Sequence, residues 1–140
     1  YPNKPIELIV AFAAGTGTDT TARLISNSIA EQAGQPVVVD NRAGANGFIA
    51  AQAVAGAPAD GYTFLVTTST THAVNAALFK RLPYDPIKDF APVSLLTKAG
   101  LVLVVRSGGP IRTVDDLAAF VQSETQKWAL LVKAADIEPE

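Results

Sequence analysis

Short apolar runs alternate with helical patterns along this sequence. Ile6 to Phe12 is almost continuously apolar, as in a strand buried on both faces, and further short runs follow at Pro36 to Asp40 and Tyr62 to Thr67. Between the first two runs, apolar residues recur at helical spacing on one face: Ala22, Ile25 and Ile29. The alternation predicts an α/β fold with a mainly parallel sheet flanked by helices.

Residues that favour turns and helix ends lie between these elements. Thr18 can cap the first helix, and Gly34 can end it in a left-handed conformation. The glycine-rich turn Gly44 to Gly47 then opens a short helix that extends through Val54. The turn Ala57 to Gly61 leads into the third predicted strand.

The second half of the chain continues this alternation. The hydroxyl-rich segment Thr68 to Thr71 is expected to start a helix that reaches about Leu78. A proline-rich connection, Leu82 to Pro86, leads to two further predicted strands, Ala91 to Leu96 and Leu101 to Arg106.

The strongest helical pattern comes last. Thr113 and Asp116 resemble a capping box, with Asp where Glu is usual. One stripe of apolar residues follows: Val114, Leu117, Val121, Trp128, Val132 and Ala135. We therefore expect residues 1–140 to form a single three-layer α/β lobe, closed by a long C-terminal helix.

Composition excludes several classes of function. The chain has 140 residues and a net charge of −2, so it lacks the basic surface that nucleic acids require. It has no cysteine, which excludes disulfides, thiol catalysis and cysteine-ligated metals. The acidic residues are scattered singly and match no metal-ligand spacing, so no metal site is predicted.

The first candidate site is the loop Ala11 to Asp19 after the first strand. Its small residues let a ligand approach the backbone, and the following helix adds the positive end of its dipole. The loop holds no Lys or Arg, so a carboxylate suits it better than a phosphate. A tight strand-to-helix turn explains Gly15 and Gly17 equally well.

A dinucleotide-binding motif is a rival interpretation of the same loop. Gly15-Thr16-Gly17 follows a strand, and Asp40 ends the next one, as in a Rossmann fingerprint. The third glycine of that fingerprint would fall at Thr20, so the motif is incomplete.

The second candidate site is Thr67 to His72, which also follows a strand. Its hydroxyls and amides lie where open sheets bind ligands, although helix capping explains the same residues. Ser69 lacks the flanking glycines of a nucleophile elbow, and a lone His72 is more often structural than catalytic. The segment therefore favours binding over catalysis.

Several ordered blocks resemble one family, the periplasmic Bug receptors of tripartite tricarboxylate transporters. The blocks are YPNKPIELIVAFAAGTGTD (1–19), GQPVVVDNRAGANG (34–47), APADGYTFLV (57–66) and THAVNAALFKRLPYDPIKDFAPVSLL (71–96). The resemblance implies a lobe of the type II periplasmic binding proteins, and a periplasmic protein whose Tyr1 follows a removed signal peptide. It also implies two lobes that close on a small carboxylate and offer it to the membrane components of the transporter.

The resemblance assigns ligand contacts to the two candidate loops. They carry over as Phe12, Ala14, Gly15, Thr16, Gly17, Thr18, Asp19, Thr68, Ser69, Thr70 and His72. The family loop has prolines where Ala11 and Ala14 stand, and Gly where Thr16 stands, so a side chain at Thr16 is expected to point towards a ligand.

Length is the larger departure from the family pattern. Residues 1–112 resemble the N-terminal part of the family and 117–140 resemble its extreme C-terminus, so the second lobe is expected to be absent. We therefore expect a receptor domain without enzymatic activity or cofactor, which binds carboxylates weakly and self-associates through an exposed cleft face. A Rossmann-like enzyme fragment and an interaction module without ligand remain alternatives.

Overall fold

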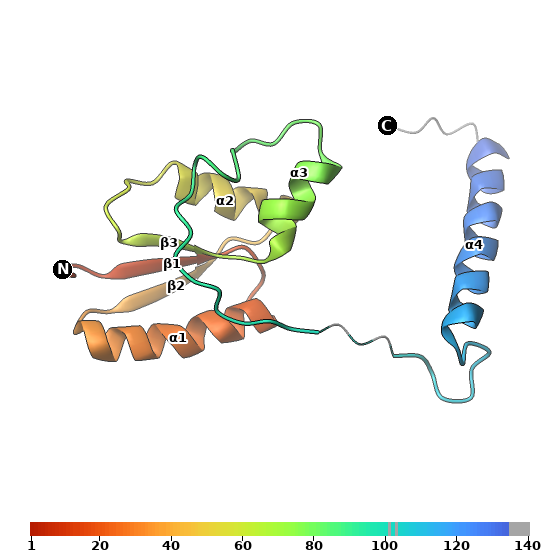
Figure 1. The fold of residues 1–140 in the computed structure, drawn as a ribbon, viewed down its shortest axis with the longest axis horizontal. Helices are drawn as coiled ribbons and strands as arrows, with labels where there is room; N and C mark the ends of the chain where they lie inside the picture. Colours follow the sequence, from red (N-terminus) through yellow and green to blue (C-terminus); the bar gives the residue numbers. More distant parts are fainter. Residues whose placement is uncertain (101, 103, 135–140) are drawn as a thin grey trace. The chain divides into compact units, whose positions relative to one another are not determined.

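The first strand of the chain is the central strand of its sheet. In the computed structural model, which describes residues 1–100, 102 and 104–134, a three-stranded parallel sheet has the order β2-β1-β3 (Figure 1). The strands are β1 (Ile6–Val10), β2 (Val37–Asn41) and β3 (Thr63–Val66). A central parallel strand is covered on both faces, which explains the nearly continuous apolar run of β1.

Helices cover both faces of this sheet. Helix α1 (Gly17–Ala33) packs on one face, where Leu8, Val10 and Ala22 form one apolar cluster. Helix α2 (Phe48–Ala55) packs on the other, where Ile9 and Ala50 belong to a second cluster. The predicted three-layer α/β architecture is confirmed, because β1 contributes buried side chains to both clusters (Figure 1).

The ends of α1 are set by one hydroxyl and one glycine. Gly34 ends the helix at φ 65°, as predicted. The N-cap is Thr16, whereas the sequence predicted Thr18. The reason is that Thr16 Oγ1 accepts a hydrogen bond from the backbone N–H of Asp19, so the helix begins two residues earlier.

The loop after β2 contains consecutive residues in the left-handed backbone conformation. Ala45 and Asn46 have φ values of 45° and 54°, and Gly47 has a φ of 86°. They form the turn η1 (Ala45–Gly47), which leads directly into α2. A Cβ on Gly47 would lie 2.5 Å from Thr71 Oγ1, so this glycine permits a close approach of η1 to the segment after β3.

The segment after β3 is helical, as predicted, but irregular. A π-helical turn, η2 (Thr70–Val74), precedes the short helix α3 (Asn75–Leu78). Figure 1 shows α3 on the same side of the sheet as α2, opposite α1.

The two predicted strands that follow are not borne out. Residues 91–96 form no strand, and Val93 and Leu95 are 79% and 72% exposed. In the predicted strand 101–106, Leu101 and Leu103 lie outside the described residues, and residues 102 and 104–106 form no strand. An apolar run becomes a strand only beside a partner that completes its hydrogen bonds, and the sheet described here ends at β2 and β3.

The chain divides into two compact units, Tyr1–Lys98 and Ala99–Glu140. The second unit contains α4 (Val114–Ala134), whose start matches the predicted capping box. Thr113 Oγ1 accepts from the N–H of Asp116 at 3.1 Å, and Asp116 Oδ2 accepts from the N–H of Thr113 at 2.9 Å. One lobe over residues 1–140 stays a prediction. Within the described parts of the chain, no helix is both long and apolar enough to cross a bilayer.

We expect Gly47→Ala to lower the free energy of unfolding by about 1 to 3 kcal/mol, because it combines a positive φ with a steric clash. Urea denaturation measures the change. Gly17→Ala is the matched control: a Cβ on Gly17 meets no atom within 4 Å, so stability should stay constant or rise by up to about 1 kcal/mol. Equal effects of the two substitutions would contradict the close approach at Gly47.

Candidate functional site

The strand order predicts a ligand crevice at the carboxyl ends of β1 and β3. The chain leaves β1 towards α1 on one face, and it leaves β3 towards α3 on the other (Figure 1). The strands stay paired to their ends, since Val10 pairs with Val66 and the N–H of Ala11 donates to Val66 O at 3.2 Å. Diverging loops at such a switch point open the crevice in which parallel α/β sheets bind ligands.

The loop after β1 is organised by the buried carboxylate of Asp19. Asp19 is 3% exposed, and its Oδ2 accepts from the N–H of Gly15 at 2.8 Å and from Arg23 Nε at 3.0 Å. Its Oδ1 accepts from Asn41 Nδ2 at 2.9 Å. Asn41 also donates to Phe12 O at 3.0 Å, so β2 and α1 both hold the loop in place.

These contacts keep Asp19 ionised. The hydrogen bond from Arg23 is the largest cause that lowers the pKa of Asp19, to about 2, and the Gly15 N–H and Asn41 act in the same direction. Burial opposes them. The charge of Asp19 is thus balanced by Arg23, and its repulsion of a bound anion is reduced. Asp19 therefore positions the loop, and both of its carboxylate oxygens already accept hydrogen bonds within the protein.

Two backbone donors of this loop remain open. The N–H of Gly15 is held by Asp19, and the N–H of Thr16 donates to Ala13 O at 3.3 Å. Gly17 and Thr18 occupy the first turn of α1, where helical geometry provides no acceptor, and none lies within the described part of the chain. Their N–H groups add to the positive end of the helix dipole.

The side chain of Thr16 is engaged within the loop itself. Its Oγ1 donates to Ala13 O at 2.8 Å while it accepts from the N–H of Asp19. Thr16 therefore stabilises the turn as an N-cap.

The loop after β3 contributes hydroxyls from the other side of the crevice. Thr67 Oγ1 and Thr68 Oγ1 are buried and find no hydrogen-bond partner among the described residues. Ser69 and Thr70 are exposed. Buried hydroxyls without partners are uncommon. The exposed hydroxyls of Ser69 and Thr70 follow β3 at the same edge of the sheet as the amides of α1.

His72 is held in an apolar contact. Its ring lies 4.8 Å from the Phe90 ring, at an interplanar angle of 70°. Burial lowers the pKa of His72 below its ordinary value of 6.5, so the imidazole is neutral at pH 7. His72 thus supplies hydrogen-bonding atoms rather than positive charge.

A buried hydrogen-bond network fixes η2 to the rest of the unit. Tyr84 Oη donates to Thr71 O at 2.5 Å, and Asn75 Nδ2 donates to Asn46 O at 2.9 Å. Tyr84 is 6% exposed, and Thr71 and Asn75 are fully buried. Sequence analysis missed this network, because nothing in the local pattern distinguishes these residues from surface polar residues.

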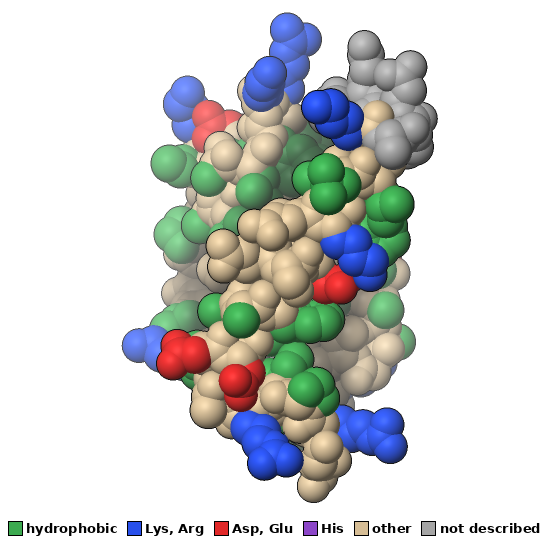
Figure 2. Space-filling model, turned by 90° about the vertical axis from the view of Figure 1, so that its right-hand side faces the viewer, with side chains coloured by type: hydrophobic (Ala, Val, Ile, Leu, Met, Phe, Trp, Pro, Cys, Tyr) green, Lys and Arg blue, Asp and Glu red, His purple; other side chains and the backbone are tan. Residues whose placement is uncertain are grey.

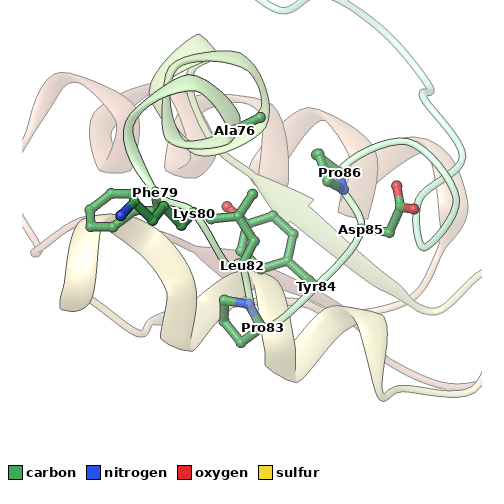
Figure 3. A pocket seen from close by; sticks show the side chains of 8 residues that line it. All are labelled: Ala76, Phe79, Lys80, Leu82, Pro83, Tyr84, Asp85 and Pro86. Atoms are coloured by element: carbon green, nitrogen blue, oxygen red, sulfur yellow. The ribbon is translucent and has the colours of Figure 1, made fainter.

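A hollow of about 560 Å³ lies apart from the crevice, beside α3 and the proline-rich connection. Figure 3 shows its lining side chains, which are Ala76, Phe79, Lys80, Leu82, Pro83, Tyr84, Asp85 and Pro86. The hollow is wide and shallow, and it contains none of the predicted site residues. The predicted crevice between β1 and β3 is the better candidate, because the open amides of α1 and the hydroxyls after β3 follow two paired strands that end at the same edge of the sheet.

The structure thus brings both predicted loops to one edge of the sheet. The first loop contains Phe12, Ala14, Gly15, Thr16, Gly17, Thr18 and Asp19, and the second contains Thr68, Ser69, Thr70 and His72. Arg23 and Asn41 were missed, although the spacing of four between Asp19 and Arg23 on a helix was a usable signal. No group of three or more His, Cys, Asp or Glu in the described part of the chain could hold a metal ion.

Comparison with known proteins gives a consistent result. A sequence model described as "Tripartite tricarboxylate transporter family receptor" matches residues 21–130. A UPF0065 protein of Bordetella bronchiseptica is 40% identical over 124 residues, which cover 89% of this chain and 37% of the relative. BugT of Bordetella pertussis is 38% identical over 135 residues, which cover 96% of this chain and 41% of BugT.

Solved structures agree with the sequence relatives. MatC of Rhodopseudomonas palustris, solved with bound malate, superposes with a TM-score of 0.82 at 42% identity and covers 89% of this chain and 42% of MatC. A second R. palustris protein, solved with adipate, gives a TM-score of 0.79 at 40% identity over 88% of this chain and 41% of that protein. The chain thus spans about two fifths of the relatives that it matches.

We expect Asp19→Asn to flatten the pH dependence of stability. The pKa of Asp19 is depressed in the folded protein, so its contribution is present above the ordinary value of 3.8 and is lost as pH falls towards about 2. Urea denaturation at several pH values should show wild type losing its advantage over the variant across that window. Other carboxylates with lowered pKa values, such as Asp60 and Asp116, are shared by both proteins and cancel. Parallel pH profiles would disprove the role of Asp19.

Proposed function

The chain belongs to the tripartite tricarboxylate transporter receptor family, and from that membership we propose that it is a receptor domain that binds small organic carboxylates between the carboxyl ends of β1 and β3. The family is described as a receptor family, and one structural neighbour is titled a TctC solute binding protein, so both point to a receptor rather than an enzyme. The Rossmann-like enzyme alternative is therefore set aside.

One observation carries the proposal: the open N–H groups of Gly17 and Thr18 lie in the first turn of a helix of 17 residues, directly after the loop that leaves β1. A carboxylate oxygen can accept from both amides, and the helix dipole favours its negative charge. No lysine or arginine lies in the loop Ala11 to Asp19, which fits a carboxylate better than a more highly charged phosphate.

The hydroxyls after β3 complete the proposed recognition. Ser69 and Thr70 are exposed in this loop, and each hydroxyl can donate to a ligand oxygen or accept from a ligand hydroxyl. Malate and adipate, the ligands of two structural neighbours, are both dicarboxylates. We infer that short dicarboxylates are the ligands to test first.

Affinity is expected to be low for the chain of 140 residues. Small-molecule sites bury most of the ligand surface, whereas the donors described here come from two loops at one edge of a sheet. A dissociation constant of about 1 mM or weaker, corresponding to about −4 kcal/mol, is consistent with a few hydrogen bonds on one face of a ligand.

Location and partners follow from the family as part of the same proposal. The receptor would work in the periplasm after removal of a signal peptide, and it would deliver its carboxylate to the membrane components of a tripartite tricarboxylate transporter. An interaction module without ligand is the alternative outcome if no carboxylate binds.

We expect Gly17→Pro to weaken malate or adipate binding about 10-fold or more, because proline removes one of the two open amides. The fold should tolerate this change. Proline is favoured at the first position of a helix, and Thr16 has the extended conformation (φ −74°, ψ 162°) that precedes proline. NMR chemical-shift titration up to tens of millimolar ligand measures the affinity.

Gly17→Ala is the matched control, since it retains the amide and has space for its methyl group. It should bind like wild type. Equal affinities of the proline and alanine variants would rule out the amide of Gly17 as a ligand contact.

A further inference from the structure

The buried polar atoms that lack a hydrogen-bond partner are concentrated in one short segment. Within the described part of the chain, the side chains that hold such an atom all lie between positions 67 and 75: Thr67, Thr68, Thr71, His72 and Asn75. Figure 2 shows the usual arrangement for comparison, with charged side chains at the surface among hydrophobic ones. Each unpaired buried group carries a desolvation cost, so the segment that contains the second candidate loop is costly to hold in this conformation.

The same segment contains the π-helical turn η2. The N–H of Asn75 donates to Thr70 O, five residues earlier, whereas in an α-helix it would donate to Thr71 O. The π-helical register therefore leaves the carbonyl of Thr71 without the N–H of Asn75. Single π-helical turns are rare, and many of them lie at functional sites.

The hydroxyl of Tyr84 takes the place of that N–H. Tyr84 comes from the proline-rich connection after α3 (Figure 3), and its Oη donates to Thr71 O at 2.5 Å. Asn75 Nδ2 donates to the same Oη at 3.4 Å and to Asn46 O at 2.9 Å. Tyr84 thus satisfies the acceptor that an α-helical turn would pair with the N–H of Asn75, so it favours the π-helical register.

A change of register would be confined to the second candidate loop. The sheet holds one end of the segment, since Val66 pairs with Val10, and Asn75 holds the other end through Asn46 O. An α-helical turn closes over one residue fewer than a π-helical turn, so residues 67–71 would have to absorb the difference. One residue corresponds to a rotation of about 100° around a helix axis, which would redirect the hydroxyls and N–H groups of this loop.

From these contacts we propose that Tyr84 is a positioning residue: its hydroxyl holds η2 in the π-helical register and thereby fixes the orientation of the loop Thr67 to His72. The register stands on the hydrogen bonds alone, whereas its consequence for carboxylate binding rests on the proposed function. Without the hydroxyl, the cost of the unpaired polar atoms and of the π-helical geometry favours the α-helical register.

NMR measures the register directly, through the scalar coupling that crosses a backbone hydrogen bond. In wild type the N–H of Asn75 should couple to the carbonyl carbon of Thr70, and in Tyr84→Phe it should couple to that of Thr71. Phenylalanine keeps the ring contacts with Phe48 and Phe90, both at 5.9 Å between centroids, so the variant should fold. A wild-type coupling to Thr71, or an unchanged coupling in the variant, would overturn the proposal.

Tyr62→Phe is the matched control, because it also removes a hydroxyl with two hydrogen bonds. Tyr62 Oη accepts from the N–H of Asn3 at 3.0 Å and donates to Asn3 Oδ1 at 2.7 Å. Tyr62 precedes β3, at the opposite end of the strand from η2. The coupling between Asn75 and Thr70 should persist in this variant, and its transfer to Thr71 here as well would contradict a specific role of Tyr84.

Deletion of Ser69 tests the register without a change at Tyr84. It removes the residue by which the π-helical turn exceeds an α-helical one, so Asn75 should couple to Thr71. Tyr84→Phe should then lower stability in urea less in the deletion variant than in the intact chain, and it should fold in the deletion variant even if it does not fold in the intact chain. Equal losses in both would show that the hydroxyl does not act through the register.

Titration with malate separates this proposal from the proposed function. Tyr62→Phe should bind like wild type, and Tyr84→Phe should bind about 5-fold more weakly or worse, because the donors of its second loop are redirected. Equal binding by all three proteins would disprove the effect of the register on the site. Absence of binding by wild type would disprove the proposed function, and the NMR coupling would still decide the role of Tyr84.

Discussion

The buried carboxylate of Asp19 is the interaction on which the candidate site depends. It joins the loop after β1 through Gly15, its own helix through Arg23, and the neighbouring strand through Asn41. Because the acceptors of one side chain fix three separate segments, the first turn of α1 has only one position relative to the sheet. The open N–H groups of that turn therefore keep one orientation, and binding a ligand there requires little ordering of the loop.

The opposite wall of the crevice is held by a different means. There the backbone itself is irregular, with a left-handed turn before α2 and a π-helical turn after β3. Asn75 donates to Asn46 O in the first of these turns, and Tyr84 donates to Thr71 O in the second. The contact between Gly47 and Thr71 brings the two turns together. Irregular backbone of this kind is retained where surrounding contacts determine it, as at a binding site.

Local sequence patterns predicted the parts of the fold that depend on neighbours in the chain. The apolar run of β1 and the helix end at Gly34 are of this type. The apolar runs between residues 91 and 106 led to the wrong prediction of strands, because hydrophobicity alone cannot tell whether a partner strand is present. The residues that brace the site were missed for a related reason. Asn41 reaches Asp19 across 22 residues, and Asn75 reaches Asn46 across 29, so their roles arise only in the folded chain.

The central place of β1 also determines the order in which the lobe can be completed during synthesis. Ile6 pairs with Val37, and Glu7 pairs with Thr63, so both pairings of the central strand join segments that lie far apart along the chain. Closing such loops costs entropy before the pairing repays it, which slows the folding of parallel sheets. The apolar first strand is synthesised first and obtains its second neighbour last. A nascent chain therefore exposes this apolar strand until β3 has emerged, and binding by a chaperone would protect it from aggregation in that interval.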